Sequence, residues 1–242
     1  TAVGSLALDV NTTAESNTAV GWTALSAATT GGYNTAVGSD ALAANTTGAY
    51  NVAVGYLTLD ANTTADNNTA VGHAALGANT TGTSNTAVGK SALAANTTGT
   101  NNTAIGLSAL AANTASYSNI AIGIRALDAF NVTTATSTYN VAVGEDALGS
   151  CTTGVENTAI GGEALIANTT GAYNTAVGRD AGDGITTGSS NICIGYNADV
   201  NDTAAANQIC IGTSVAASGD NYVTIGKASP NFIYNGFTSN AT

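Results

Sequence analysis

Few residues in this chain have side chains that could carry out chemistry. The single histidine, His73, occupies a slot that holds Trp22, Ser39, Tyr56 or Lys90 elsewhere along the chain. A catalytic site needs a convergent nucleophile, base and stabilising group, and a metal centre needs several clustered ligands. Neither pattern stands out, so we predict no catalytic residue, no metal site and no cofactor, and a protein that is not an enzyme.

One column of acidic residues and one pair of cysteines each allow two interpretations. Asp40, Asp146, Glu163 and Asp180 share a slot of the repeat described below, which would suit either a solvated turn or a ladder of calcium ions. We favour the turn, because the Gly-Gly-x-Gly-x-Asp calcium repeat is absent.

The cysteines Cys193 and Cys210 occupy equivalent slots of adjacent repeats, where stacking would bring their Cα atoms near disulfide range. The alternative is that Cys replaces Ala as a small buried residue, and this is the reading we favour. Cys151 is the third cysteine, so the chain cannot pair all of its thiols internally and the redox compartment stays open.

Asn-x-Thr sequons offer the remaining candidate chemistry, the attachment of N-linked glycans. We expect the main acceptors in one exposed turn column, and further sequons stand at Asn67, Asn101, Asn131, Asn201 and Asn240. The members of that column are Asn11, Asn45, Asn62, Asn79, Asn96 and Asn168. The competing reading is that Asn and Thr serve the turns and ladders of the fold.

These residues are placed by a tandem repeat that fills the chain. The motif Asn-Thr-Ala-Val-Gly recurs, with its glycines seventeen positions apart from Gly4 to Gly123 and again from Gly144 to Gly212. The step from Gly123 to Gly144 is longer than the others, so we predict a four-residue bulge near residues 130–137. Such strict periodicity predicts a solenoid of stacked coils.

Each repeat predicts a short strand followed by a second anchor and a turn. Two β-branched residues flank one small residue in the motif, which is the period-two signature of a strand. We expect the β-branched pair to face the coil interior and the small residue to face outwards, against another chain. A Leu four residues after Gly, such as Leu25, predicts a second inward anchor, on a second short strand or an extended turn. Asn-Thr-Thr-Gly predicts a turn in which Gly takes positive φ.

Stacking at about 4.8 Å per coil predicts parallel strands, a rod on the order of 65 Å long, and ladders of equivalent side chains. The residues expected in one amide ladder are Asn17, Asn34, Asn51, Asn68, Asn85, Asn102 and Asn119. We therefore predict an all-β, parallel β-solenoid of about 14 coils over residues 1–229. An aromatic tail over residues 230–242 is expected to be a cap or an inter-subunit contact, through Phe232, Tyr234 and Phe237.

Composition excludes several classes of function. Charged residues make up 8% of the chain, and 4 Lys and Arg stand against 15 Asp and Glu, which gives a net charge of −11. The chain has no basic patch that could neutralise phosphates, so nucleic-acid binding is not expected. No run of 18 apolar residues occurs, so we expect no membrane insertion.

The repeated Asn-Thr-Ala-Val-Gly, which becomes Asn-Ile-Cys-Ile-Gly at 191–195, resembles the head repeats of trimeric autotransporter adhesins. It is equally similar to repeat regions of tail-fibre proteins of phages and bacteria. The resemblance covers nearly the whole chain and implies a left-handed β-roll that assembles as a homotrimer. The family's repeat is usually shorter than the one here and is nearer in length to the step from Gly212 to Gly226.

We therefore expect a structural extracellular fibre or adhesin segment on a cell or virion surface, which self-associates as a homotrimer or a head-to-tail filament. The alternatives are a receptor-binding tail-fibre segment, which would contact host receptors or glycans through variable slots such as Trp22, Tyr56 and His73, and a glycosylated filament subunit. An ice-binding solenoid is a further alternative, although Asn-Thr-Thr is expected in a turn.

Overall fold

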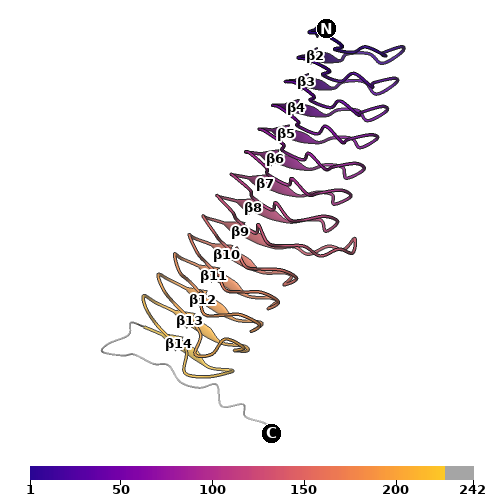
Figure 1. Ribbon diagram of the computed structural model, residues 1–242. Coiled ribbons are helices and arrows are strands. Elements are labelled where there is room, and N and C mark those ends of the chain that lie inside the picture. The colour runs from indigo at the N-terminus through magenta and orange to yellow at the C-terminus, as the bar shows by residue number, and fades with distance from the viewer. Residues whose placement is uncertain (227–242) are drawn as a thin grey trace.

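The computed structural model describes residues 1–226 and contains, over that range, one parallel sheet and no helix (Figure 1). All 14 strands pair with their sequence neighbours in the order β1 to β14. The strands are β1 (Ala2–Val3), β2 (Thr18–Val20), β3 (Thr35–Val37), β4 (Val52–Val54), β5 (Thr69–Val71), β6 (Thr86–Val88), β7 (Thr103–Ile105), β8 (Ile120–Ile122), β9 (Val141–Val143), β10 (Thr158–Ile160), β11 (Thr175–Val177), β12 (Ile192–Ile194), β13 (Ile209–Ile211) and β14 (Val223–Ile225). The predicted parallel β-solenoid is confirmed; its left-handedness stays a prediction.

The register of the sheet follows the repeat. Thr86 pairs with Thr103, Ala87 with Ala104 and Val88 with Ile105, and every other strand pair aligns equivalent residues in the same way. Register is also kept across the long coil, where Ile120 pairs with Val141. The coil that follows β8 extends further at its tip than its neighbours, which is the predicted bulge (Figure 1).

The direction in which the strand side chains point was predicted wrongly. The central small residue of each strand, such as Ala87, is fully buried in the coil interior, whereas Thr86 and Val88 on either side are only half buried and point outwards. The reason is the thinness of the coil. A Cβ built on Gly182, which replaces the anchor Leu, would lie 3.0 Å from Leu165, 3.3 Å from Ile185 and 3.6 Å from the Cβ of Ala176. The anchors therefore reach the strand across the coil, and only a small side chain fits opposite them.

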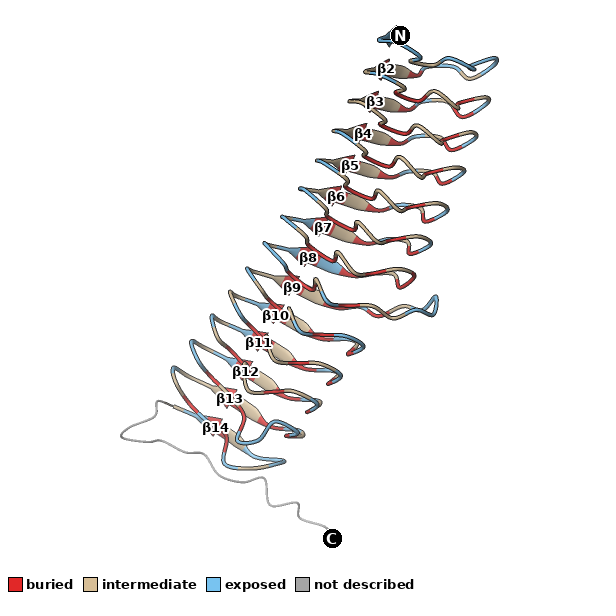
Figure 2. Cartoon of the chain, in the orientation of Figure 1, coloured by how far each residue is buried: buried red, intermediate tan, exposed pale blue. Residues whose placement is uncertain are grey.

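The second inward anchor is confirmed, and it lies on an extended turn rather than on a second strand. From the second coil on, the Leu anchors, such as Leu25, Leu42 and Leu76, are fully buried and make up, with the strand Ala, most of the core (Figure 2). Leu8 of the first coil is only partly buried. Leu25 has φ 51°, in the left-handed region, and its N–H donates to the carbonyl of Ala41 in the next coil at 2.9 Å. Coil-to-coil hydrogen bonds thus hold a backbone conformation that a bulky residue disfavours.

The glycine of Asn-Thr-Thr-Gly does not take positive φ, contrary to expectation. Gly48 is instead needed for space, because an added Cβ would lie 2.4 Å from the carbonyl oxygen of Ala65 in the next coil. The left-handed residue comes two positions later, at Tyr50, with φ 59°. The motif glycines do require their special backbone, since Gly89 has φ 132°, a region open almost only to glycine.

Candidate functional site

Two buried columns of Asn side chains stiffen the coils. The first Asn ladder, formed by the Asn that precedes each strand, is confirmed: the Oδ1 of Asn68 accepts from the backbone N–H of Asn85 at 3.0 Å, and the Oδ1 of Asn85 does the same for Asn102. From Asn17 to Asn191, with Asn119 as the exception, the Nδ2 also donates to the carbonyl of a turn residue 14 positions on, as from Asn85 to Gly99 at 2.8 Å. Every coil is therefore tied to the next by side chains as well as backbone.

The second Asn ladder is the column in which we expected exposed glycan acceptors, and that expectation of exposure is wrong for five of its residues. Asn45, Asn62, Asn79, Asn96 and Asn168 are fully buried, and only Asn11 is exposed. The turn folds inwards because the Nδ2 of Asn96 donates to Asn79 Oδ1 at 2.9 Å and to the Gly99 carbonyl at 3.0 Å. An amide held in this way has no room for a glycan.

Other sequons lie nearer the solvent. Asn67, Asn101 and Asn201 are exposed, and Asn131 is half buried at the base of the bulge. Asn240 and the tail residues Phe232, Tyr234 and Phe237 lie outside the described residues. The accessible acceptor positions therefore lie mostly outside the turn column that the sequence favoured.

The acidic column and His73 do not come together as a metal or catalytic site within residues 1–226. Asp146 pairs with Arg125 of the preceding coil, with 2.7 Å between its Oδ1 and Nε. Across residues 1–226, no group of three or more His, Cys, Asp or Glu is placed to hold a metal ion. His73 lies beside Tyr56, with ring centroids 5.6 Å apart, and both are exposed at the corner that follows the motif glycine.

The three cysteines are buried free thiols. Cys193 and Cys210 are register partners in β12 and β13, in the slot that holds Ala in other coils, which agrees with the reading of Cys as a small core residue. Hydrogen bonding with Cys210 and burial raise the pKa of Cys193, and burial raises the pKa of Cys151 to about 12. Cys151 and Cys193 are therefore protonated at neutral pH, which disfavours nucleophilic chemistry at either thiol. The same hydrogen bond between the two thiols lowers the pKa of Cys210.

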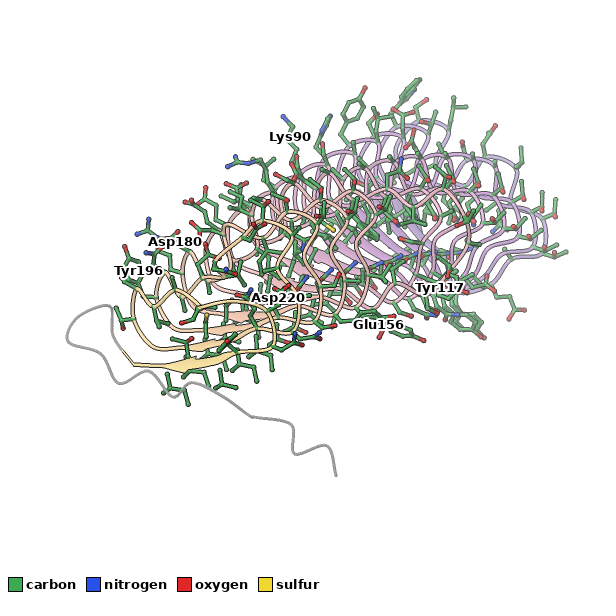
Figure 3. All side chains as sticks on the ribbon, turned by 90° about the horizontal axis from the view of Figure 1, so that it is seen from below. Lys90, Tyr117, Glu156, Asp180, Tyr196 and Asp220 are labelled. Atoms are coloured by element: carbon green, nitrogen blue, oxygen red, sulfur yellow. The ribbon has the colours of Figure 1, made fainter. Side chains whose placement is uncertain are left out.

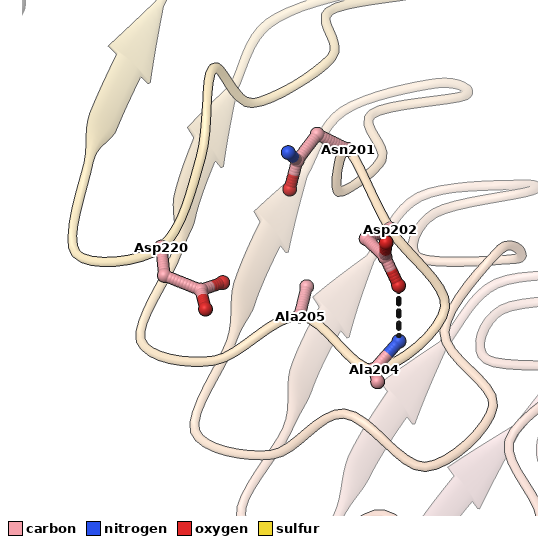
Figure 4. Close-up of a pocket in the computed structure, with 5 residues that line it drawn as sticks. All are labelled: Asn201, Asp202, Ala204, Ala205 and Asp220. Atoms are coloured by element: carbon pink, nitrogen blue, oxygen red, sulfur yellow. Dashed lines mark hydrogen bonds between the residues drawn. The ribbon is translucent and has the colours of Figure 1, made fainter.

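A shallow pocket of about 350 Å³ lies on the last coils, between β12 and β14 (Figure 4). Its lining is Asn201, Asp202, Ala204, Ala205 and Asp220. The carboxylate of Asp202 accepts from the Ala204 N–H at 2.9 Å, and hydrogen bonds from the Ala206 N–H and from Gln208 lower the pKa of Asp220. Both carboxylates are thus engaged by backbone N–H groups, and the lining of the pocket brings no histidine, serine or cysteine to them. The absence of enzymatic activity stays a prediction.

The remaining candidate surfaces run along the outside of the rod. We call the outward-pointing first and third residues of the strands the outer face; it holds only Thr, Val and Ile from β2 to β14. The corner column is the residue after each motif glycine, and it includes Trp22, Tyr56, His73, Lys90 and Tyr196.

The edge column is the residue before each Asn of the first ladder. It includes Tyr33 and Tyr50, whose rings stack with centroids 5.0 Å apart and planes 7° apart. Figure 3 shows Lys90 and Tyr196 of the corner column on one side of the rod and Glu156 of the edge column on the other. The aromatic rings of the two columns therefore lie on different surfaces of the rod, and the sequence analysis did not distinguish these two surfaces.

No helix within residues 1–226 has the length and apolar character needed to cross a bilayer. In comparisons with known proteins, the chain matches no family model, no curated protein and no solved structure.

Proposed function

We propose that this chain is a structural segment of an extracellular fibre, a stiff rod that spaces or displays other parts on a cell or virion surface. The observation that carries the proposal is the unbroken register of 14 parallel strands, in which each coil is bonded to the next by backbone and by the first Asn ladder. In such a stack each coil contacts only its neighbours, so length is added without changing the cross-section.

The outer face supports self-association. Parallel sheets are usually covered on both faces, yet here exposed Ile105, Ile120 and Ile122 form an aliphatic patch in the middle of the rod. Leu107 and Ile124 of the corner column extend that patch and are also exposed. No residue of the outer face carries a charge, so a contact made there buries no charged side chain.

The outer face offers an area for contact between copies. Two side-chain columns about 7 Å apart along a rod of about 65 Å give roughly 450 Å², which is more than half of the roughly 800 Å² that each partner of a typical stable complex buries. A second copy carries the same periodicity of about 4.8 Å, so its side chains match this surface along its whole length. We propose a homotrimer in which the outer faces meet around a common axis, and a head-to-tail filament is the alternative.

The test compares outward and inward charges on the same two strands. Thr86→Glu with Thr103→Glu adds carboxylates to the outer face and should leave the coil folded but monomeric by light scattering. Ala87→Glu with Ala104→Glu places them inside the coil and should instead abolish folding, as judged by circular dichroism. A wild type that is monomeric, or an outward variant with unchanged mass, would contradict the proposed interface. Electron microscopy of the native particle would then decide whether copies join end to end.

Glycosylation stays an additional proposal for the exposed sequons Asn11 and Asn201, which lie outside the edge column. Mass spectrometry of the protein purified from its natural source would show modified peptides there and none at buried Asn79 or Asn96. Modification of the buried pair would contradict the second Asn ladder.

A further inference from the structure

The edge column carries an unusual choice of residues. Four of its members are tyrosines, and the other coils use Ser or Asn at this slot, with Glu156 as the exception. The four rings are exposed on the rod, with relative exposures of 54% to 58%. They are Tyr33, Tyr50, Tyr139 and Tyr173.

The fold does not require these rings. Tyr50 has φ 59°, and Ser84 and Asn101 take φ 58° and 55° at the same slot. Their N–H groups make equivalent hydrogen bonds to the preceding coil, from Tyr50 to Gly32 at 3.2 Å and from Ser84 to Asp66 at 3.1 Å. Asn tolerates left-handed backbone better than a bulky aromatic residue does. The fold imposes this backbone on every coil, so the choice of tyrosine for it, where Ser or Asn would be less strained, is the unusual feature of the slot.

The composition of the column is that of a recognition surface. Tyr supplies large, rigid and amphipathic contact area at small entropic cost, and Ser and Asn supply adaptable hydrogen bonds. The stacked pair Tyr33 and Tyr50 is held in place by its own ring contact, which lowers the entropy lost on binding. Both kinds of group lie along one edge of the rod, where the tyrosines form two groups, Tyr33 with Tyr50 and Tyr139 with Tyr173, and Ser and Asn fill the coils between the two groups.

We propose that the edge column binds a neutral glycan chain lying along the rod. Sugar rings offer apolar C–H faces to aromatic rings and hydroxyl groups to Ser and Asn, which matches the two kinds of residue present. The column holds no cation and the chain is strongly acidic, which disfavours a polyanion. The edge is one residue wide. The residues before it are mostly small or polar, such as Gly32, Ala49 and Thr83, with Tyr117 and Val155 as the exceptions, and the buried first Asn ladder follows it. The edge therefore lacks the broad apolar centre of a protein–protein interface, whereas a linear polymer fits a linear ridge.

Each edge residue lies two positions before the first outer-face residue of its strand, so mass is measured beside glycan binding and the two proposals can fail separately. The test uses the full chain in affinity gel electrophoresis with dextran, mannan and hydroxyethylcellulose as neutral probes. The edge variant replaces Tyr33, Tyr50, Tyr139 and Tyr173 by Ser, the residue that other coils carry at this slot. The control variant replaces Tyr56 and Tyr196 of the corner column by Ser, since these rings are similarly exposed, at 50% and 51%, on the other side of the rod.

We expect at least one probe to retard the wild type and the control variant, and the edge variant to lose affinity by about tenfold or more, as several aromatic contacts are removed. Three outcomes would overturn the proposal: a wild type that no probe retards, a control variant weakened as much as the edge variant, and an edge variant that binds like the wild type. An edge variant with a changed mass by light scattering would assign the tyrosines to assembly instead and would also overturn it.

Discussion

Asn168 is buried in the second Asn ladder without a hydrogen-bond partner for either its Oδ1 or its Nδ2. The slots above and below it hold Cys151 and Ile185, which offer its amide no partner of the kind that Asn gives Asn elsewhere in the column. Asn96, in the same column, makes the full set of bonds: Nδ2 donates to Asn79 and Gly99, and Oδ1 accepts from Asn113 at 2.9 Å. The same residue type thus has opposite energetic roles at two equivalent slots.

Asn168→Ile tests this difference, and Asn96→Ile is the matched variant. Each unsatisfied buried polar group costs about 1–3 kcal/mol, and Ile185 shows that the slot accepts this side chain. Allowing for the fixed rotamer of Ile, we expect Asn168→Ile to raise the free energy of unfolding by about 2 kcal/mol. Asn96→Ile removes three hydrogen bonds of about 1 kcal/mol each and leaves their partners unpaired, so we expect a loss of about 3 kcal/mol or more.

Urea denaturation followed by circular dichroism measures both changes. With a slope of about 3 kcal/mol per molar urea or slightly more for a chain of this size, Asn168→Ile should move the midpoint up by roughly 0.5 M and Asn96→Ile should move it down. Amide exchange on the flanking coils checks that the effect is local, because coils of a solenoid can unfold separately. If Asn168→Ile loses as much stability as Asn96→Ile, the Asn168 amide is not unsatisfied. Its hydrogen bonds would then be made, for example, by an internal water.

Three further predictions concern a motif glycine, the bulge and a buried thiol. Gly89→Ala should lower the free energy of unfolding by more than about 3 kcal/mol in a denaturation experiment. A Cβ there would lie 2.5 Å from the Gly106 carbonyl oxygen, on a backbone with φ 132°. Gly77→Ala is the control and should be near neutral, because the nearest atom to its Cβ would lie at 3.4 Å. Deleting residues 133–136, which are exposed at the tip of the bulge, should change stability by less than about 1 kcal/mol, and a larger loss would make the bulge a core element. Cys151, with its pKa raised to about 12, should resist alkylation at pH 8 until urea unfolds the chain, as peptide mapping would show. Because the folded pKa lies above the unfolded one, the thiol's contribution to stability is complete below about pH 8.5 and is lost as the pH rises towards 12.

The surfaces on which the proposals rest were only partly accessible to sequence reasoning. The corner residues Trp22, Tyr56 and His73 were recognised as variable slots, and they are exposed. The edge column was missed, although the restriction of this slot almost entirely to Tyr, Ser and Asn was visible in the sequence. The missing information was the backbone: only the positive φ of Tyr50 shows that tyrosine is a costly choice there.

Periodicity alone determined the solenoid, the parallel register, the bulge and the first Asn ladder, because a fixed spacing along the chain brings equivalent groups to neighbouring coils whatever the details of the coil. It could not determine which way a strand faces. Alternation assigns Thr86 and Val88 to one side and Ala87 to the other, and it leaves open which side is the interior. That choice depends on the thickness of the coil, which is set by anchors such as Leu93 reaching across to the strand and by the inward fold of Asn96 in the turn. Only the tertiary structure contains those distances, and they leave room inside for a methyl group and send the β-branched side chains out.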